Sequence, residues 1–92
     1  KNEKIENLKI EKKNLLISIG RLTRQKNFLL LINAFKKILN KYPNYHLVLI
    51  GEGEEKNLLI KKIKKLNIED KVSLLGYQKN VYKYLLNYPI QV

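Results

Sequence analysis

The sequence predicts an α/β fold: a parallel sheet in the order β-α-β-α-β-α-β, with helices on both faces. Three observations support this prediction. Short apolar runs without polar alternation recur along the chain, as in strands that are buried on both faces. Each run is followed by a segment whose apolar residues repeat at helical spacing. The connections are short, as in βαβ units with right-handed crossovers.

The first predicted strand covers residues 15–19, and the first helix covers residues 28–41. Asn27 belongs to the residue types favoured at N-caps, so we expect it to cap this helix. The segment 42–44, Tyr-Pro-Asn, ends the helix because proline cannot continue it. One face of the helix is predicted to be buried through Phe28, Leu31, Ile32, Phe35, Ile38 and Leu39.

The second half of the chain repeats this pattern. We expect a strand at residues 46–50 and a helix at residues 54–66. Glu54 and Glu55 would lie in the first turn of that helix, where negative charge suits the helix dipole. A third strand at 72–75, a third helix at 79–87 and the opening of a fourth strand at 89–92 complete the predicted order.

Length and composition fit one small globular domain. The chain has 92 residues, of which 45% are hydrophobic, so disorder is not expected. We expect residues 1–14 to be a linker or the end of a preceding element, and residues 15–92 to form the domain. The absence of cysteine excludes disulfides and cysteine-ligated metals, and it is consistent with a cytoplasmic location.

The net charge of +11 raises the question of a nucleic-acid partner. The chain contains seventeen lysines and only two arginines, together with eleven asparagines and eleven isoleucines. An AT-rich genome produces this composition whatever the function, so we expect no nucleic-acid partner. Two interpretations of the lysines stay open: solvated helix faces, which composition favours, and attraction to an anionic membrane surface at the inner face of the membrane.

The segment from Ser18 to Lys26 is the strongest candidate for a binding site. It leads from a predicted strand through Gly20 and cations to a helix start. Backbone N–H groups and the helix dipole favour an anion at such a place. Arg21 adds a planar fork suited to diphosphate oxygens, and Lys26 adds a point charge.

Glycine-bearing turns follow all three predicted strands: Gly20, Gly51 with Gly53, and Gly76. Ligands of parallel α/β folds lie at the carboxyl ends of the strands, so these turns share the ligand-facing edge. Tyr77 follows the third strand at that edge. Taken alone, the Gly51-Glu52-Gly53 turn favours a tight connection, because it lacks the third glycine of a dinucleotide fingerprint.

The remaining candidates favour structural roles. His46 is the single histidine and has no neighbouring acid or cysteine in the sequence, so we interpret it as structural. The acidic residues are too dispersed to form a metal site, and no serine has the surroundings of an activated nucleophile. We therefore expect no metal and no separate cofactor.

Four motifs occur in order: Ser18-Ile-Gly-Arg-Leu-x-x-x-Lys26, Asn33-Ala-Phe35, His46-Leu-Val-Leu-Ile-Gly-Glu-Gly53 and Val72-Ser-Leu-Leu-Gly-Tyr77. Together they resemble the start of the C-terminal, donor-binding domain of the retaining glycosyltransferases of family 4. These are the group 1 type, with the GT-B arrangement of two Rossmann-like domains. The resemblance covers about residues 15–88.

The resemblance implies transfer of a hexosyl group from a nucleotide-sugar to a glycan or lipid-linked acceptor, with retention at the anomeric carbon, in polysaccharide biosynthesis. It assigns donor diphosphate binding to Arg21 and Lys26. It assigns the backbone of the nucleotide pocket to the turns after the strands, at Gly20, Gly51, Gly53, Gly76 and Tyr77. The two cations would then stabilise the charge that grows on the leaving diphosphate.

Two departures from the family pattern qualify these implications. Asn27 stands where many members have glycine. The family's E-x7-E motif and its acceptor domain do not occur in these 92 residues, so we assign no catalytic residue and expect the chain alone not to catalyse transfer. Two alternatives stay open: a non-catalytic nucleotide- or phosphate-binding module, and a basic nucleic-acid-binding domain.

Overall fold

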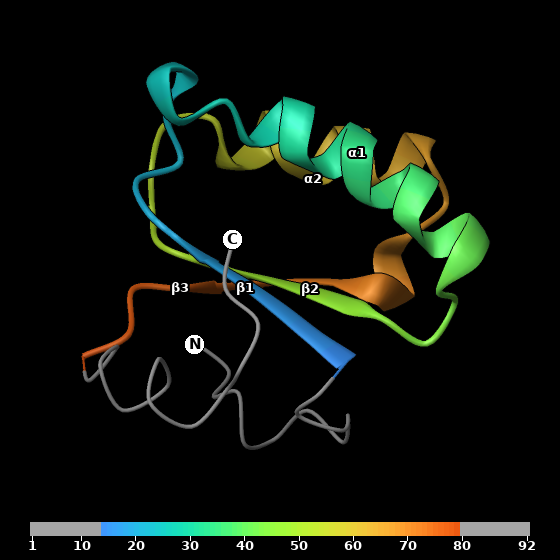
Figure 1. Ribbon diagram of the computed structural model, residues 1–92. Helices are drawn as coiled ribbons and strands as arrows, with labels where there is room; N and C mark the ends of the chain where they lie inside the picture. Colours follow the sequence, from blue (N-terminus) through green and yellow to red (C-terminus); the bar gives the residue numbers. More distant parts are fainter. Residues whose placement is uncertain (1–13, 80–92) are drawn as a thin grey trace.

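The computed structural model describes residues 14–79, which form a three-stranded parallel sheet covered by two α-helices (Figure 1). The strands are β1 (Leu15–Ile19), β2 (His46–Ile50) and β3 (Val72–Gly76), and the helices are α1 (Phe28–Lys41) and α2 (Lys56–Lys65). Short 3-10 helices, η3 (Arg24–Lys26) and η4 (Glu69–Lys71), precede α1 and β3. No helix within residues 14–79 is long and apolar enough to span a membrane.

The sheet has the order β1-β2-β3, with parallel pairing throughout. In β1 and β2 the pairing runs in register from Leu15 opposite His46 to Ile19 opposite Ile50. Between β2 and β3 the register shifts at the end, where Ile50 lies opposite Gly76. The carboxyl ends of all three strands therefore meet at one edge, which confirms the predicted placement of the glycine-bearing turns.

Both faces of the sheet are buried. On one face, strand residues such as Leu47 and Leu49 pack with Phe35 of α1 and Leu59 of α2. The opposite face forms a second buried cluster of Leu15, Ile17, Val48, Ile50 and Leu75. This burial explains why the strands lack polar alternation.

Within residues 14–79, α1 and α2 cover the same face of the sheet (Figure 1). The predicted third helix (79–87) and fourth strand (89–92) fall outside the described residues, apart from Lys79. The predicted linker, residues 1–14, also falls outside them except for Asn14. The predicted bounds of β1, β2 and α1 are confirmed, and β3 extends one residue further, to Gly76.

Two details of the helix starts differ from the prediction. Helix α2 begins at Lys56 rather than at residue 54, so Glu54 and Glu55 precede it, with Glu55 as the N-cap. The N–H of Glu55 donates instead to the carbonyl of Leu22, at 2.9 Å. Asn27 does cap α1, but without a side-chain hydrogen bond: its φ is 54°, and its backbone carbonyl accepts from the N–H groups at the helix start.

Candidate functional site

The turns after β1 and β2 are joined through their backbones. The N–H of Gly20 donates to the carbonyl of Ile50 at 3.0 Å, and the N–H of Leu22 donates to the carbonyl of Glu52 at 2.9 Å. These bonds continue the β1–β2 ladder beyond the end of the strands. The turn after β3 joins the same edge, since the N–H of Gly51 donates to the carbonyl of Gly76 at 2.9 Å.

Positions 51 and 53 require glycine because the turn after β2 lies very close to the backbone of the turn after β1. A Cβ on Gly51 would lie 1.8 Å from the carbonyl oxygen of Gly20, and a Cβ on Gly53 would lie 2.3 Å from that of Leu22. Both obstacles are backbone atoms, which cannot move without breaking the ladder. The predicted tight connection at Gly51 and Gly53 therefore exists, and it fixes the loop that carries Arg21.

The loop after β1 is anchored at both ends by buried apolar side chains. Leu22 is fully buried, and Phe28 at the start of α1 is buried almost as completely. Arg21, directly before Leu22, is exposed, and so are Arg24 and Lys26 between the two apolar residues. The loop therefore presents cations to solvent from a backbone that the core holds in place.

A pocket of about 520 Å³ opens at the carboxyl edge of the sheet. Residues from all three turns line it: Ile19, Gly20, Arg21, Ile50, Gly51, Glu52, Tyr77, Gln78 and Lys79. The structure thus brings together four of the predicted site residues, namely Gly20, Arg21, Gly51 and Tyr77. Gly53 and Gly76 support the turns rather than lining this pocket.

Arg21 and Lys26 differ in their placement. Arg21 lines the pocket and also a neighbouring polar hollow of about 390 Å³, which Thr23, Arg24, Gln25 and Glu54 share. Lys26 does not line either one; its aliphatic chain lies over Gly20, and its Nζ is 5.9 Å from the centre of the Phe28 ring. Arg21 is therefore better placed than Lys26 for a ligand in the pocket, and Lys79 is a second cation among the lining residues.

Several backbone N–H groups of the loop are already used within the protein. The N–H groups of Gly20, Leu22, Thr23, Lys26 and Asn27 all donate to backbone carbonyls within the protein. They satisfy the loop's own turns and its bonds to the next strand. These five N–H groups are therefore not available to an anion, whereas the exposed side-chain cations of the loop are.

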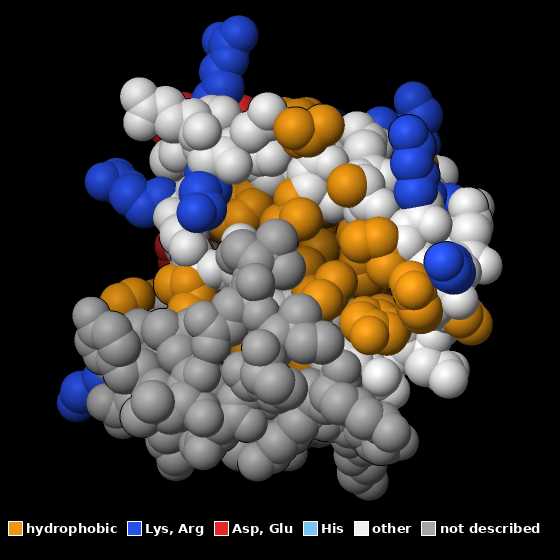
Figure 2. Space-filling model, in the orientation of Figure 1, with side chains coloured by type: hydrophobic (Ala, Val, Ile, Leu, Met, Phe, Trp, Pro, Cys, Tyr) orange, Lys and Arg blue, Asp and Glu red, His pale blue; other side chains and the backbone are white. Residues whose placement is uncertain are grey.

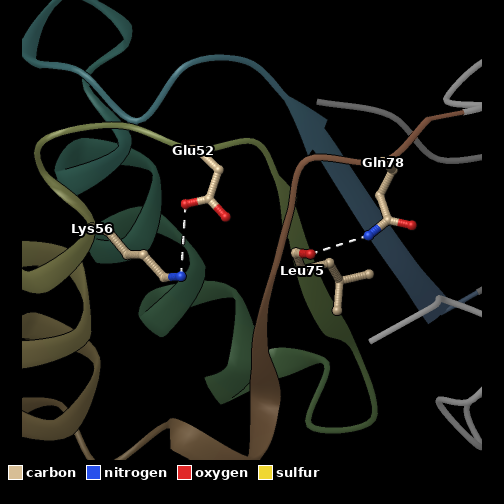
Figure 3. Close-up of polar contacts among 4 residues, drawn as sticks. All are labelled: Glu52, Lys56, Leu75 and Gln78. Atoms are coloured by element: carbon tan, nitrogen blue, oxygen red, sulfur yellow. Dashed lines mark hydrogen bonds and ion pairs between the residues drawn. The ribbon is translucent and has the colours of Figure 1, made fainter. Parts of the chain in front are cut away.

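Glu52, Gln78 and Lys79 are pocket residues that the sequence did not identify as part of a site. Glu52 forms an ion pair with Lys56, with 3.6 Å between Nζ and Oε1, while the Gln78 amide donates to the carbonyl of Leu75 at 3.0 Å (Figure 3). Gln78 is buried, whereas Tyr77 beside it is 68% exposed. The one available sequence signal was position shortly after a strand, which is β2 for Glu52 and β3 for Gln78 and Lys79.

His46 lies at the amino-terminal end of β2, at the opposite edge of the sheet from the pocket. Its Nε2 lies 2.8 Å from the hydroxyl of Ser73. Burial is the main cause that lowers the pKa of His46 from 6.5 to about 4; the charge of Lys71 also lowers the pKa, and Asp70 opposes the shift. This neutral, hydrogen-bonded imidazole fits the structural role predicted for it. No three His, Cys, Asp or Glu residues between 14 and 79 are grouped to hold a metal ion.

Comparisons with known proteins agree with this geometry. Residues 1–91 match the family described as glycosyl transferases group 1. An uncharacterised glycosyltransferase of Methanocaldococcus jannaschii is 51% identical over 71 residues, which are 77% of this chain and 18% of that protein. The N-acetylgalactosamine-N,N'-diacetylbacillosaminyl-diphospho-undecaprenol 4-alpha-N-acetylgalactosaminyltransferase of Campylobacter jejuni is 43% identical over 74 residues, or 80% of this chain and 20% of that protein.

The fold also matches a solved structure. TarM of S. aureus, crystallised with UDP among its ligands, superposes with a TM-score of 0.82 at 26% identity, over 89% of this chain and 17% of that one. The chain therefore spans about a fifth of the length of the curated relatives named above. The strand–loop–helix order, the pocket where the strands end and the match over residues 1–91 agree: the chain belongs to the group 1 glycosyl transferases.

Proposed function

We propose that these residues form the donor-diphosphate site of a glycosyltransferase that moves a hexosyl group from a nucleotide-sugar to an acceptor. The observation that carries the proposal is the position of Arg21. It projects from a fixed loop into a pocket built by the turns of three parallel strands. Ligands bind at this edge in parallel α/β folds, and arginine matches phosphate oxygens in a bidentate manner.

The proposed role of this site is to compensate the negative charge that develops on the leaving diphosphate. During transfer the bond between the anomeric carbon and the diphosphate oxygen breaks, a bond to an acceptor oxygen forms, and the electron pair stays on the leaving diphosphate. A guanidinium held beside those oxygens stabilises the transition state more than the ground state, because the negative charge grows there. Lys26, whose chain lies over Gly20, adds a second cation at the pocket edge. The proposed site uses no metal.

The proposed donor and acceptor classes rest on relatives. TarM was crystallised with UDP, which supports a nucleotide-sugar donor. The Campylobacter relative is named for a diphospho-undecaprenol substrate, which supports a lipid-linked glycan acceptor and action at a membrane. Retention at the anomeric carbon follows from the family resemblance. The acceptor would be bound by parts of the full-length protein other than these 92 residues.

Titration with UDP and UMP tests the proposal. Arg21→Ala should weaken UDP binding about 10- to 100-fold, the range of a lost charge-assisted hydrogen bond, and should weaken UMP binding less. Lys26→Ala should have a smaller effect on UDP, because Lys26 does not line the pocket. Arg24→Ala is the matched control, since Arg24 is an exposed arginine of the same loop that does not line the main pocket.

Two results would contradict the assignment. In the first, Arg21→Ala binds UDP as tightly as the unaltered protein. In the second, Arg24→Ala weakens binding as much as Arg21→Ala does, so the effect is general loss of positive charge. Repeating the titration at several salt concentrations distinguishes binding at Arg21 from general attraction to positive charge. Attraction to spread charge depends steeply on salt concentration.

A further inference from the structure

The helix layer carries charge of a single sign. Helices α1 and α2 contain eight lysines and no acidic residue: Lys36, Lys37, Lys41, Lys56, Lys61, Lys62, Lys64 and Lys65. Within residues 14–79 the acidic residues lie beyond the two ends of α2, in the turns and in η4. A codon bias toward lysine does not by itself remove carboxylates from both helices. Lys56 forms an ion pair with Glu52, and the other seven lysines leave the layer with a large excess of positive charge.

The same layer exposes apolar side chains. A hollow of about 280 Å³ between the helices is lined by Leu29, Asn33, Leu58, Lys61, Lys62 and Lys65. Leu30 is 64% exposed and Leu58 is 46% exposed. Each is the third residue of its helix, and both helices connect parallel strands, so the two leucines lie toward the same end of the layer. Figure 2 views the molecule from the side on which α1 lies in front of α2, and it shows hydrophobic side chains along α1 and between α1 and the sheet, with Lys and Arg side chains projecting around them.

We propose that this α1/α2 face, defined by Leu30, Leu58, Lys61, Lys62 and Lys65, docks on an anionic lipid surface. Leucine side chains can enter the boundary between headgroups and acyl chains, while lysines keep their charge among lipid phosphates. A second copy of the chain is disfavoured as occupant because two cationic faces repel. A nucleic acid is disfavoured because neither helix contains arginine, and both phenylalanines of α1 are buried.

The orientation of the face relates it to the pocket. Leu30 and Leu58 lie near the helix starts, and each helix starts at the carboxyl edge of the sheet, where the pocket opens. Docking through these leucines would hold the donor pocket close to the bilayer. Docking through the α1/α2 face rests on the proposed action at a membrane. Binding of the protein to vesicles, however, does not require a nucleotide-sugar donor. If the protein fails to bind vesicles, the assignment of Arg21 to UDP binding is unaffected. If Arg21→Ala fails to weaken UDP binding, the docking face is unaffected.

Sedimentation with vesicles tests the docking face, using phosphatidylcholine alone and phosphatidylcholine mixed with phosphatidylglycerol. Lys61→Gln/Lys65→Gln removes two lysines that line the hollow, and Lys64→Gln/Lys71→Gln removes the same charge from positions that do not. Each lysine near an anionic surface contributes about fivefold, so the first pair should lower affinity about 30-fold and the control pair much less. Leu30→Ser/Leu58→Ser should also weaken binding while keeping the charge.

All these side chains are outside the buried core, so circular dichroism should show the variants folded. The proposal is supported if mixed vesicles bind the protein, neutral vesicles do not, and the groove and leucine variants bind less than the control. It is overturned if mixed vesicles do not sediment the unaltered protein, or if the two lysine pairs have equal effects. It is also overturned if the leucine variant binds normally, or if the protein binds a polynucleotide more tightly than mixed vesicles and the Lys61→Gln/Lys65→Gln pair removes that binding.

Discussion

Gly51→Ala should destabilise the protein far more than Gly20→Ala, although both glycines line the same pocket. A Cβ at position 51 would meet the carbonyl oxygen of Gly20 at 1.8 Å, and the φ of Gly51 is 148°, where side chains are strained. A Cβ at position 20 would meet the Cε of Lys26 at 2.8 Å. That contact is with the far end of a flexible side chain, which can move away.

The size of the effect at Gly51 follows from two costs. The unfavourable φ contributes about 1–3 kcal/mol. Moving the Gly20 carbonyl out of contact disturbs the ladder bonds from Gly20 to Ile50 and from Leu22 to Glu52, each worth about 1 kcal/mol. The sum, about 3–5 kcal/mol, is a large part of the roughly 5–15 kcal/mol by which domains are stable. Gly20→Ala should cost less than about 1 kcal/mol.

Urea unfolding followed by circular dichroism measures both variants against the unaltered protein. The expected result is a large fall in the unfolding midpoint for Gly51→Ala and a small one for Gly20→Ala, with similar m-values. Equal midpoints for the two variants would refute the reasoning. They would show that the two turns can separate without loss, so that their close contact does not hold the loop.

Two further predictions concern His46 and Asn27. The folded pKa of His46, about 4, lies below its ordinary value of 6.5, so the unfolded chain binds the proton first and stability should fall as pH drops from about 6.5 to about 4. His46→Gln keeps a polar group near Ser73 and should flatten this dependence in urea titrations at several pH values; an unchanged slope would contradict the assignment. Asn27→Ala should cost about 1 kcal/mol in the same urea assay, because Asn27 has a left-handed backbone, and Asn27→Gly should cost less. Equal losses for both variants would argue against backbone strain.

Local pattern was enough to predict most of the fold. The strands β1 and β2 and the helix α1 have the predicted bounds because their apolar runs are sharply delimited by polar or glycine residues. The start of α2 was misplaced because Glu54 and Glu55 suit a first helical turn. In the structure the N–H of Glu55 donates to the carbonyl of Leu22, and this tertiary hydrogen bond has no signature in the neighbouring sequence.

Asn27 shows how a correct residue choice can conceal a different mechanism. Asparagine is common at N-caps because its side chain accepts a hydrogen bond, but here the side chain makes no such bond. What the position requires is a φ of 54°, which asparagine tolerates better than most residues. A pattern reports the preferred residue types, not which of their properties is used.

The candidate site was predicted in outline for a similar reason. Glycines after successive strands locate the edge, because parallel pairing brings strand ends together whatever the side chains are. The roles of individual residues depend on which backbone groups are already hydrogen-bonded. Gly53 contacts the carbonyl of Leu22, and Gln78 binds the carbonyl of Leu75. Neither contact follows from spacing along the chain.

In the loop after β1, the backbone contributes to stability and the Arg21 side chain contributes to binding. Its backbone is held by the ladder bonds to β2, by the close approach of Gly51 and by the burial of Leu22, whereas the Arg21 side chain is exposed. Removing the guanidinium should therefore weaken UDP binding and leave unfolding unchanged. Altering Gly51 should change both, because it moves the frame from which Arg21 projects. Such a site fixes the backbone position of Arg21 while its side chain remains exposed. Electrostatic stabilisation of the transition state depends on where that charge is placed.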